Sequence, residues 1–285
     1  MVRIGIPRAL LYYQYYPMWK TFFEYLGGEV VISDHTTKEM LTSGSSRVIA
    51  ETCLPVKVFC GHVLSLVDKC DYVFIPAIRS VEKRVYNCSK FLGLPDMTKA
   101  VIPECPPILD VDIDATKGKR DLYQNVYKLG RHFTWNPYKV KEATKAALQA
   151  HEKYQVKMYT QNLTPPEAIE EMFEQPQDTN RDSNTESLSN SINVALIGHP
   201  YLIYDDYVNY RLTTRLQGMG AKVLFPETIE KGDLDAAVIK LAFRSPTTYP
   251  TLHLGAGGYY LENKVDGVIG VMAFGCGPDS LMMYT

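Results

Sequence analysis

Residues 3–33, "RIGIPRALLYYQYYPMWKTFFEYLGGEVVIS", decide the fold class. A short apolar run comes first, and apolar residues at helical spacing follow it. Gly27 and Gly28 end the helical pattern, because glycine readily adopts the left-handed conformation in which many helices stop. A second apolar run comes directly after the two glycines. The stretch therefore predicts a β-α-β unit.

The same alternation continues along the chain. Residues 54–69 have a helical pattern, and residues 71–78, "DYVFIPAI", predict one buried strand. Helices that alternate with short apolar strands indicate a parallel sheet covered on both faces. Long helical patterns follow at residues 116–133, 138–163 and 164–175.

The opening pattern returns later in the chain. Residues 195–227 align with residues 2–34 without a gap, and the identities fall on the strand end, the helix start and the helix stop. We therefore predict an α/β protein with two Rossmann-like domains, each a doubly wound parallel sheet, joined by a helical segment and separated by a cleft. The alternative to a repeated domain is that any two β-α-β units share similar residues at their strand ends, helix starts and helix stops.

The expected domain limits follow from these patterns. The first α/β domain spans residues 1–115, a helical connection spans 116–175, and the second α/β domain spans 192–285. Between them, residues 176–191 contain one apolar side chain and predict a flexible linker. Few residues follow the last apolar strand, where a parallel-sheet domain places a helix, so the second domain is expected to be truncated.

Composition and charge exclude several classes of protein. The hydrophobic fraction is 46%, and 30 basic residues nearly balance 32 acidic ones. This balance argues against a nucleic-acid or anionic-membrane partner. No apolar run approaches the roughly 18 residues of a membrane-spanning helix, and the start of the chain lacks the features of a signal peptide. A cytoplasmic protein is expected, in which thiols stay reduced.

The six cysteines include no CxxC pair, so any metal site must combine distant parts of the chain. Cys53 and Cys276 each come two residues before a proline that suits the first turn of a helix. The positive end of a helix favours a thiolate, and therefore a metal ligand or nucleophile. Cys88 lies in a loop after a predicted strand, where it could join the other two. The alternative is three unrelated buried cysteines, and Cys60, Cys70 and Cys105 are expected to be structural.

Four segments carry a resemblance to a known family: "IGIPRALLYYQYYPMWKTFFEYLG", "ETCLPVKVFCGHV", "VYNCSKFLGLPDM" and "FGCGPDS". They resemble the acyl-CoA dehydratase activase-related (CoA-substrate-specific enzyme activase-like) proteins. This family is related to the cluster-binding subunits of 2-hydroxyacyl-CoA dehydratase and benzoyl-CoA reductase. The resemblance implies two Rossmann-like domains and an iron–sulfur cluster held between them by Cys53, Cys88 and Cys276.

The resemblance also implies a cofactor, an activity and partners. Three thiolates suit a [4Fe–4S] cluster with one open iron, and related proteins hold a double-cubane cluster. The expected activity is low-potential electron transfer, or radical-type reduction or dehydration, with an ATP-dependent activator or a dehydratase-like subunit and an acyl-CoA substrate. The chain itself has no GxxxxGK[ST] loop, and residues 254–260, "LGAGGYY", are a weak candidate for nucleotide binding. Lys57 and Arg8 are candidates for positive charge near the cluster.

Other interpretations stay open at this stage. The chain could be a non-catalytic cluster carrier or a regulatory module that docks to a larger dehydratase-like enzyme. It could also be a metal-free two-domain binder of small molecules, and three thiolates with water would equally suit zinc. His199 follows a predicted strand and could face a ligand. The tyrosines of "LLYYQYY" could line a cleft, although helix packing with surface hydroxyls is the expectation.

Overall fold

The computed structural model describes residues 1–83, 85–173, 192–241, 248–263 and 265–277. It divides the chain into two compact units. The first holds Met1–His151 and the segment that starts at Ala273, and the second holds Glu152–Arg244 and Thr251–Met272. Every named strand pairs in parallel with its neighbours, which confirms the parallel α/β class. The predicted linker at 176–191 and the last residues, 278–285, lie outside the described residues.

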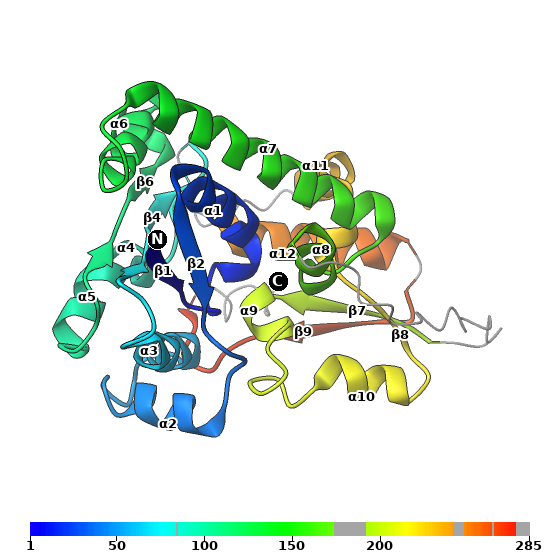
Figure 1. The fold of residues 1–285 in the computed structure, drawn as a ribbon. Helices are drawn as coiled ribbons and strands as arrows, with labels where there is room; N and C mark the ends of the chain where they lie inside the picture. The colour runs from blue at the N-terminus through cyan, green and yellow to red at the C-terminus, as the bar shows by residue number, and fades with distance from the viewer. Residues whose placement is uncertain (84, 174–191, 242–247, 264, 278–285) are drawn as a thin grey trace. The chain divides into compact units, whose positions relative to one another are not determined.

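Two parallel sheets form the centre of the first unit (Figure 1). The larger has the order β2-β1-β3-β5 and the smaller pairs β4 with β6. The strands are β1 (Val2–Ile6), β2 (Gly28–Ile32), β3 (Tyr72–Phe74), β4 (Ala77–Ser80), β5 (Ile108–Leu109) and β6 (Asp112–Asp114). The helices are α1 (Tyr12–Leu26), α2 (Lys38–Ser45), α3 (Leu54–Leu66), α4 (Ser89–Leu92), α5 (Leu94–Val101), the 3-10 turn η1 (Ala115–Lys117) and α6 (Lys119–Gly130).

Helices α1 and α3 pack against the larger sheet. The Phe23 ring of α1 packs edge-to-face on Phe74 of β3, with 4.9 Å between the ring centroids. On β1, a Cβ added to Gly5 would lie 2.7 Å from the Cys70 sulfur and 3.2 Å from Leu66 at the end of α3. Gly27 ends α1 as predicted, with a left-handed φ of 94°.

The stretch predicted as one strand at residues 71–78 forms two strands. β3 pairs with β1 and β5, whereas β4 pairs with β6 in the smaller sheet. Pro76 separates them, and proline has no N–H to donate to a neighbouring strand. Ile75 and Ala77 on either side still donate to the carbonyls of Leu109 and Val111, at 3.0 and 2.9 Å. The prediction of a single strand is therefore wrong at this proline.

The second unit has a three-stranded sheet of order β8-β7-β9. The strands are β7 (Asn193–Gly198), β8 (Lys222–Leu224) and β9 (Gly267–Val271). The helices are α8 (Pro165–Phe173), α9 (Pro200–Ile203), α10 (Leu212–Gly218), the 3-10 turn η2 (Pro226–Thr228), α11 (Lys231–Lys240) and α12 (Thr248–Glu262). The division between the units falls within α7 (Pro137–Gln161). The structure confirms the helices predicted at residues 116–133, 138–163 and 164–175, as α6, α7 and α8.

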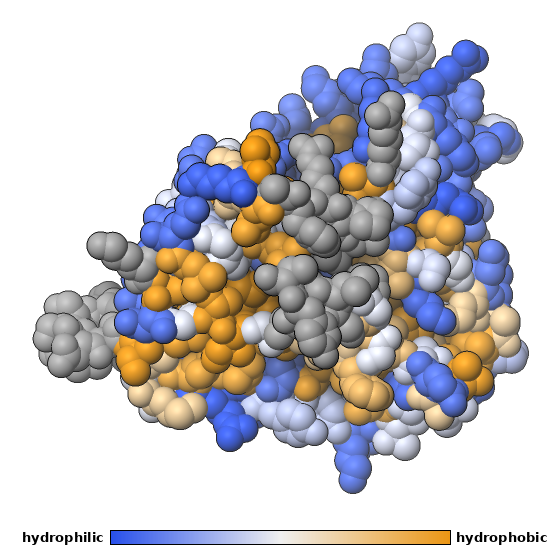
Figure 2. All heavy atoms as spheres, turned by 180° about the vertical axis from the view of Figure 1, so that it is seen from behind, coloured by the Kyte–Doolittle hydropathy of each residue, from blue (hydrophilic) through white to orange (hydrophobic). Residues whose placement is uncertain are grey.

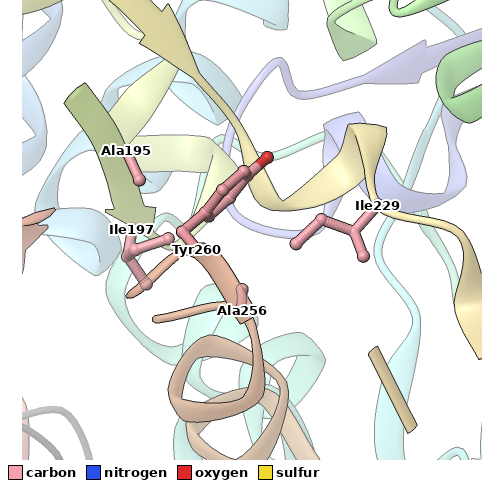
Figure 3. Close-up of a cluster of buried hydrophobic side chains, with 5 residues drawn as sticks. All are labelled: Ala195, Ile197, Ile229, Ala256 and Tyr260. Atoms are coloured by element: carbon pink, nitrogen blue, oxygen red, sulfur yellow. The ribbon is translucent and has the colours of Figure 1, made fainter. Parts of the chain in front are cut away.

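Alternate residues of β7 belong to two different clusters, as its period of two requires. Ala195 and Ile197 pack with Ala256 and Tyr260 of α12, and Figure 3 shows the Tyr260 ring between Ile197 and Ile229. The intervening Leu196 packs with Ile203 of α9 and Phe225 after β8. Apolar side chains therefore cover both faces of this sheet.

The two sheets share their strand order but not their strand register. β1 and β7 are both central, and Gly27 and Gly220 both have positive φ, at 94° and 86°. Ile4 pairs with Val30 in the first sheet, whereas Val194 pairs with Val223 in the second. The gap-free sequence alignment would have placed residue 197 opposite Val223. The correspondence therefore holds for the order of elements and fails for the register.

The glycine-rich residues 254–260 lie inside α12 and not in a phosphate-binding loop. A Cβ on Gly258 would lie 3.2 Å from the Leu241 side chain, and one on Gly255 would overlap Val238 of α11. The glycines therefore allow α11 and α12 to approach closely, whereas Gly257 meets nothing within 4 Å. The structure therefore indicates that the glycines of residues 254–260 serve helix packing, and not the nucleotide binding that the sequence weakly predicted.

Apolar side chains also reach the surface, where Figure 2 shows them on one face among charged residues. Trp135, Tyr210 and Phe274 are at least 73% exposed. The Arg131 guanidinium lies 4.0 Å from the centroid of the Trp135 ring, so it shields one side of that ring. Exposed single aromatics are common and mark no binding surface by themselves. None of the described helices combines the length and the apolar character that crossing a bilayer requires.

Candidate functional site

Cys53 caps the N-terminus of α3, as the sequence predicted. Its backbone is extended, and its carbonyl accepts hydrogen bonds from the N–H groups of Val56 and Lys57 at 3.1 and 3.3 Å. Partial burial raises the pKa of the Cys53 thiol above its usual range, while the backbone N–H of Val56 opposes that rise. A metal ion would offset the cost of the thiolate, because coordination deprotonates a thiol.

Cys88 interacts electrostatically with Cys53 although the two are far apart in the sequence. It caps the N-terminus of the short helix α4, after β4. A charge on Cys88 raises the pKa of Cys53 and the charge on Lys90 lowers it, so both residues are within electrostatic reach of the Cys53 thiol. Two of the three predicted ligands are therefore partly buried free thiols within electrostatic reach of each other.

Cys276 follows β9 in a turn. Gly275 before it has a φ of 83°, and the Cys276 N–H donates to the Ala273 carbonyl at 3.1 Å. The segment from Ala273 belongs to the same compact unit as Cys53 and Cys88. Over the part of the chain that the structure describes, no three His, Cys, Asp or Glu residues are grouped closely enough to hold a metal ion. The three-cysteine set thus stays a prediction.

The remaining cysteines occupy structural positions. Cys60 is fully buried in α3, and burial raises the pKa of its thiol to about 11. Cys70 is 7% exposed and packs against Gly5 of β1. Burial also raises the pKa of Cys105 to about 11. Lys57, which was expected to supply positive charge, donates from Nζ to the Ala50 carbonyl at 2.7 Å and so holds the loop before Cys53.

An apolar pocket opens at the carboxyl ends of β1 and β3, with a cavity volume of about 50 Å³. Strand order reverses between these two strands, which is where open α/β sheets bind ligands. The lining comes from both strand ends, the first turns of α1, and helices α3, α4 and α5. Its residues include Pro7, Tyr12, Tyr15, Tyr16, Trp19, Phe59, Phe74, Pro76, Phe91 and Leu94.

Three of the pocket residues are tyrosines that were expected to pack with surface hydroxyls. Tyr12 and Tyr16 are 6% and 3% exposed, and their rings stack with centroids 4.7 Å apart. With Tyr15, they face the pocket at the start of α1. The sequence signal for the pocket was a strand followed at once by proline and then by an aromatic run. Helices α3 and α4, which begin at Cys53 and Cys88, also supply Phe59 and Phe91 to the pocket.

A buried polar network, which no sequence pattern predicted, lies beside the carboxyl ends of β1 and β2. His62 of α3 is fully buried, with Nδ1 2.8 Å from the Ser33 hydroxyl and Nε2 2.9 Å from the Thr36 hydroxyl. The Ser33 hydroxyl also accepts from the Arg8 backbone N–H at 2.8 Å. Burial, with a smaller contribution from the charge of Arg8, lowers the pKa of His62 to about 4. Neutral His62 therefore joins α3 to both strand ends.

Residues 3–229 match a family model described as CoA enzyme activase uncharacterised domain (DUF2229). The match spans well over half of the 285 residues. The chain belongs to this CoA enzyme activase family. The resemblance expected from the sequence is thus confirmed. The matched region includes Cys53, Cys88 and the pocket, and it ends before Cys276. A search of the curated proteins found no match to the chain.

The activase-family chain has a second group of polar residues at the carboxyl end of β7. His199 caps α9, and its ring stacks on Tyr201 at 4.6 Å and meets His253 of α12 edge-to-face at 4.7 Å. Both histidines are 5% exposed. The sequence placed His199 at this strand end and did not foresee His253, because their contact is made across the fold.

Glu227 follows β8 in the same unit of the activase-family chain. The Tyr204 hydroxyl donates to its carboxylate at 2.8 Å. Burial raises the pKa of Glu227 to about 7, and the bond from Tyr204 opposes that rise. Nearby, the Tyr260 hydroxyl donates to the Phe225 carbonyl at 2.6 Å. A protonated Glu227 is therefore compatible with this site near neutral pH.

Glu227 is expected to make the second unit less stable as the pH rises from about 4.5 to about 7. The unfolded chain releases the Glu227 proton near 4.5, whereas the folded chain holds it to about 7, so raising the pH favours unfolding across that window. The full effect is at most roughly 3 kcal/mol. Hydrogen exchange of peptides from β7 and α12 should show this slope. Glu227→Gln should flatten it, and Glu230→Gln, at an exposed position, should leave it unchanged.

Proposed function

We propose that this activase-family chain is an iron–sulfur protein whose cluster is held by Cys53 and Cys88, with Cys276 as the third ligand. The observation that carries the proposal is the pairing of Cys53 with Cys88: each residue is the N-cap of a helix, and a charge on Cys88 raises the pKa of the Cys53 thiol. Backbone N–H groups at helix starts stabilise thiolates and the negative charge of a cluster. That Cys276 belongs to the same unit also supports the set.

The proposed cluster is [4Fe–4S] or double-cubane, and when bound it would supply low-potential electron transfer. The protein residues would hold it and tune its charge, and Lys90 supplies a positive charge that lowers the pKa of Cys53. The family description, CoA enzyme activase, supports a role beside an ATP-dependent activator or a dehydratase-like subunit that acts on acyl-CoA. The shared strand orders β2-β1-β3 and β8-β7-β9 support two Rossmann-like domains.

Anaerobic purification followed by iron and acid-labile sulfide analysis and EPR tests the cluster. We expect about four iron and four sulfide per chain for a single cubane, and loss of most of both in Cys53→Ser and Cys88→Ser. Cys276→Ser tests the third ligand. Cys105→Ser is the matched control, because its thiol is also partly buried but lies outside the set. Metal without sulfide would indicate zinc, and no iron after reconstitution would overturn the proposal.

The pocket at β1 and β3 favours a second candidate function, the binding of a small molecule without a metal. It is enclosed by aromatic and aliphatic side chains and lies at the topological switch point of the sheet. Ligand binding that persists in the Cys53→Ser, Cys88→Ser, Cys276→Ser triple variant would show that this function stands without the cluster.

A further inference from the structure

Arg8 lies directly after β1, between two residues that line the pocket. Its neighbours Pro7 and Ala9 both face the pocket, and its guanidinium carbon lies 5.7 Å from the centroid of the Tyr12 ring, another lining residue. Its backbone N–H donates to the Ser33 hydroxyl, which is itself bound to buried His62. The side chain therefore starts from a fixed backbone position at the edge of an apolar pocket.

The charge of Arg8 is not balanced by any group that the structure describes. Nη1 lies 3.1 Å from His35 Nε2, and because a guanidinium only donates, the imidazole nitrogen is the acceptor and carries no balancing negative charge. Nε is buried without a hydrogen-bond partner. The adjacent Asp34 pairs with Lys69 at 3.6 Å, and no described carboxylate pairs with Arg8.

An unmatched guanidinium beside an apolar pocket predicts the chemistry of a ligand. A partly buried cation with an unsatisfied donor is costly, and an anion would relieve that cost. Carboxylates suit arginine best, because two parallel hydrogen bonds can form to one edge of the guanidinium. Nη1 is engaged with His35 and Nε is buried, so Nη2 is the nitrogen left to meet a carboxylate.

We propose that the first unit binds a short-chain monocarboxylate, with its apolar chain in the pocket and its carboxylate on Arg8. The small cavity volume of about 50 Å³ limits the chain to a few carbons. The lining accepts an apolar chain because most of its residues are aromatic or aliphatic, among them Trp19, Phe59 and Phe91. This inference goes beyond the cluster, because it requires neither a metal nor Cys53.

Tryptophan fluorescence gives a direct readout of this site. The chain has two tryptophans, of which Trp19 lines the pocket and Trp135 is 73% exposed. In a Trp135→Phe background, Trp19 is the single reporter. The probes are hexanoate, which is ionised at pH 7, hexanamide, which has the chain without the charge, and acetate, which has the charge without the chain. Metal-free protein is used, so failure here says nothing about the cluster.

We expect hexanoate to change Trp19 emission with an affinity at least about ten-fold above those of hexanamide and acetate, as a charge-assisted contact and a buried chain require. Arg8→Gln should weaken hexanoate binding about ten-fold and leave hexanamide binding unchanged, and Arg8→Lys should retain part of the affinity. In the Trp135→Phe protein, in which Arg8 is intact, equal affinities for hexanoate and hexanamide would overturn the proposal. So would equal affinities for hexanoate and acetate, or no response to hexanoate.

Discussion

Replacing Gly61 with alanine is expected to destabilise the first unit by about 3 kcal/mol or more, the upper range for overpacking. Gly61 of α3 lies against α2, where an added Cβ would fall 2.6 Å from the carbonyl carbon of Met40. Gly44 of α2 faces it, and a Cβ there would fall 2.5 Å from the Gly61 nitrogen. Backbone lies against backbone at this point, so no side-chain rotation can relieve the overlap.

Urea unfolding followed by tryptophan fluorescence measures this effect, because Trp19 and Trp135 both belong to the first unit. Gly93→Ala is the matched control. Gly93 has a φ of −94°, and a Cβ there would come no closer than 3.9 Å to another atom. Its stability should change by less than about 1 kcal/mol. Equal unfolding midpoints for Gly61→Ala and Gly93→Ala would contradict the close approach of α2 and α3.

The stability of the first unit is also expected to fall as the pH drops from about 6.5 to about 4, because of His62. The unfolded chain binds a proton on this imidazole near 6.5, whereas the folded chain resists it until about 4. Across that window the unfolded state holds more protons, so stability rises with pH. The full loss is roughly 3 kcal/mol, the free-energy equivalent of the shift. Removing the side chain in His62→Ala would also leave the Ser33 and Thr36 hydroxyls without their partner.

His62→Gln separates titration from packing. The glutamine amide can still bond a hydroxyl but does not titrate, so urea midpoints should become flat between pH 4 and 6.5 in that variant, relative to the unmodified chain. His132→Gln is the control, because His132 is exposed and should leave the pH dependence intact. A His62→Gln protein that kept the full slope would assign the acid sensitivity to other groups.

The two cysteines proposed to hold a cluster and the pocket share their supporting helices. The helices α3 and α4 begin at Cys53 and Cys88, and each also places one phenylalanine, Phe59 or Phe91, in the pocket wall. A ligand in the pocket and a cluster on the thiols would therefore be supported by the same two helices. The iron analysis and the Trp19 titration test the two independently.

The sequence by itself determined the features that depend on neighbouring residues. The β-α-β start, the stop of α1 at Gly27 and the placement of Cys53 at a helix start all follow from apolar spacing and capping, which act within a few residues. The long helix α7 was predicted for the same reason. Local rules also predicted one strand at residues 71–78, and they failed at Pro76, where pairing with different neighbours decided the outcome.

Only the tertiary structure decided which distant residues meet. The approach of Cys88 to Cys53, the hydrogen bonds of His62 to Ser33 and Thr36, and the contact of Gly61 with α2 each join segments that no local pattern links. The physical reason is that helix and strand formation depend on backbone geometry along the chain, whereas burial, pKa and packing depend on whatever the fold brings into contact. The sequence motifs contain the cysteines and Arg8. The fold decides that Cys53 and Cys88 interact and that Arg8 lies beside an apolar pocket.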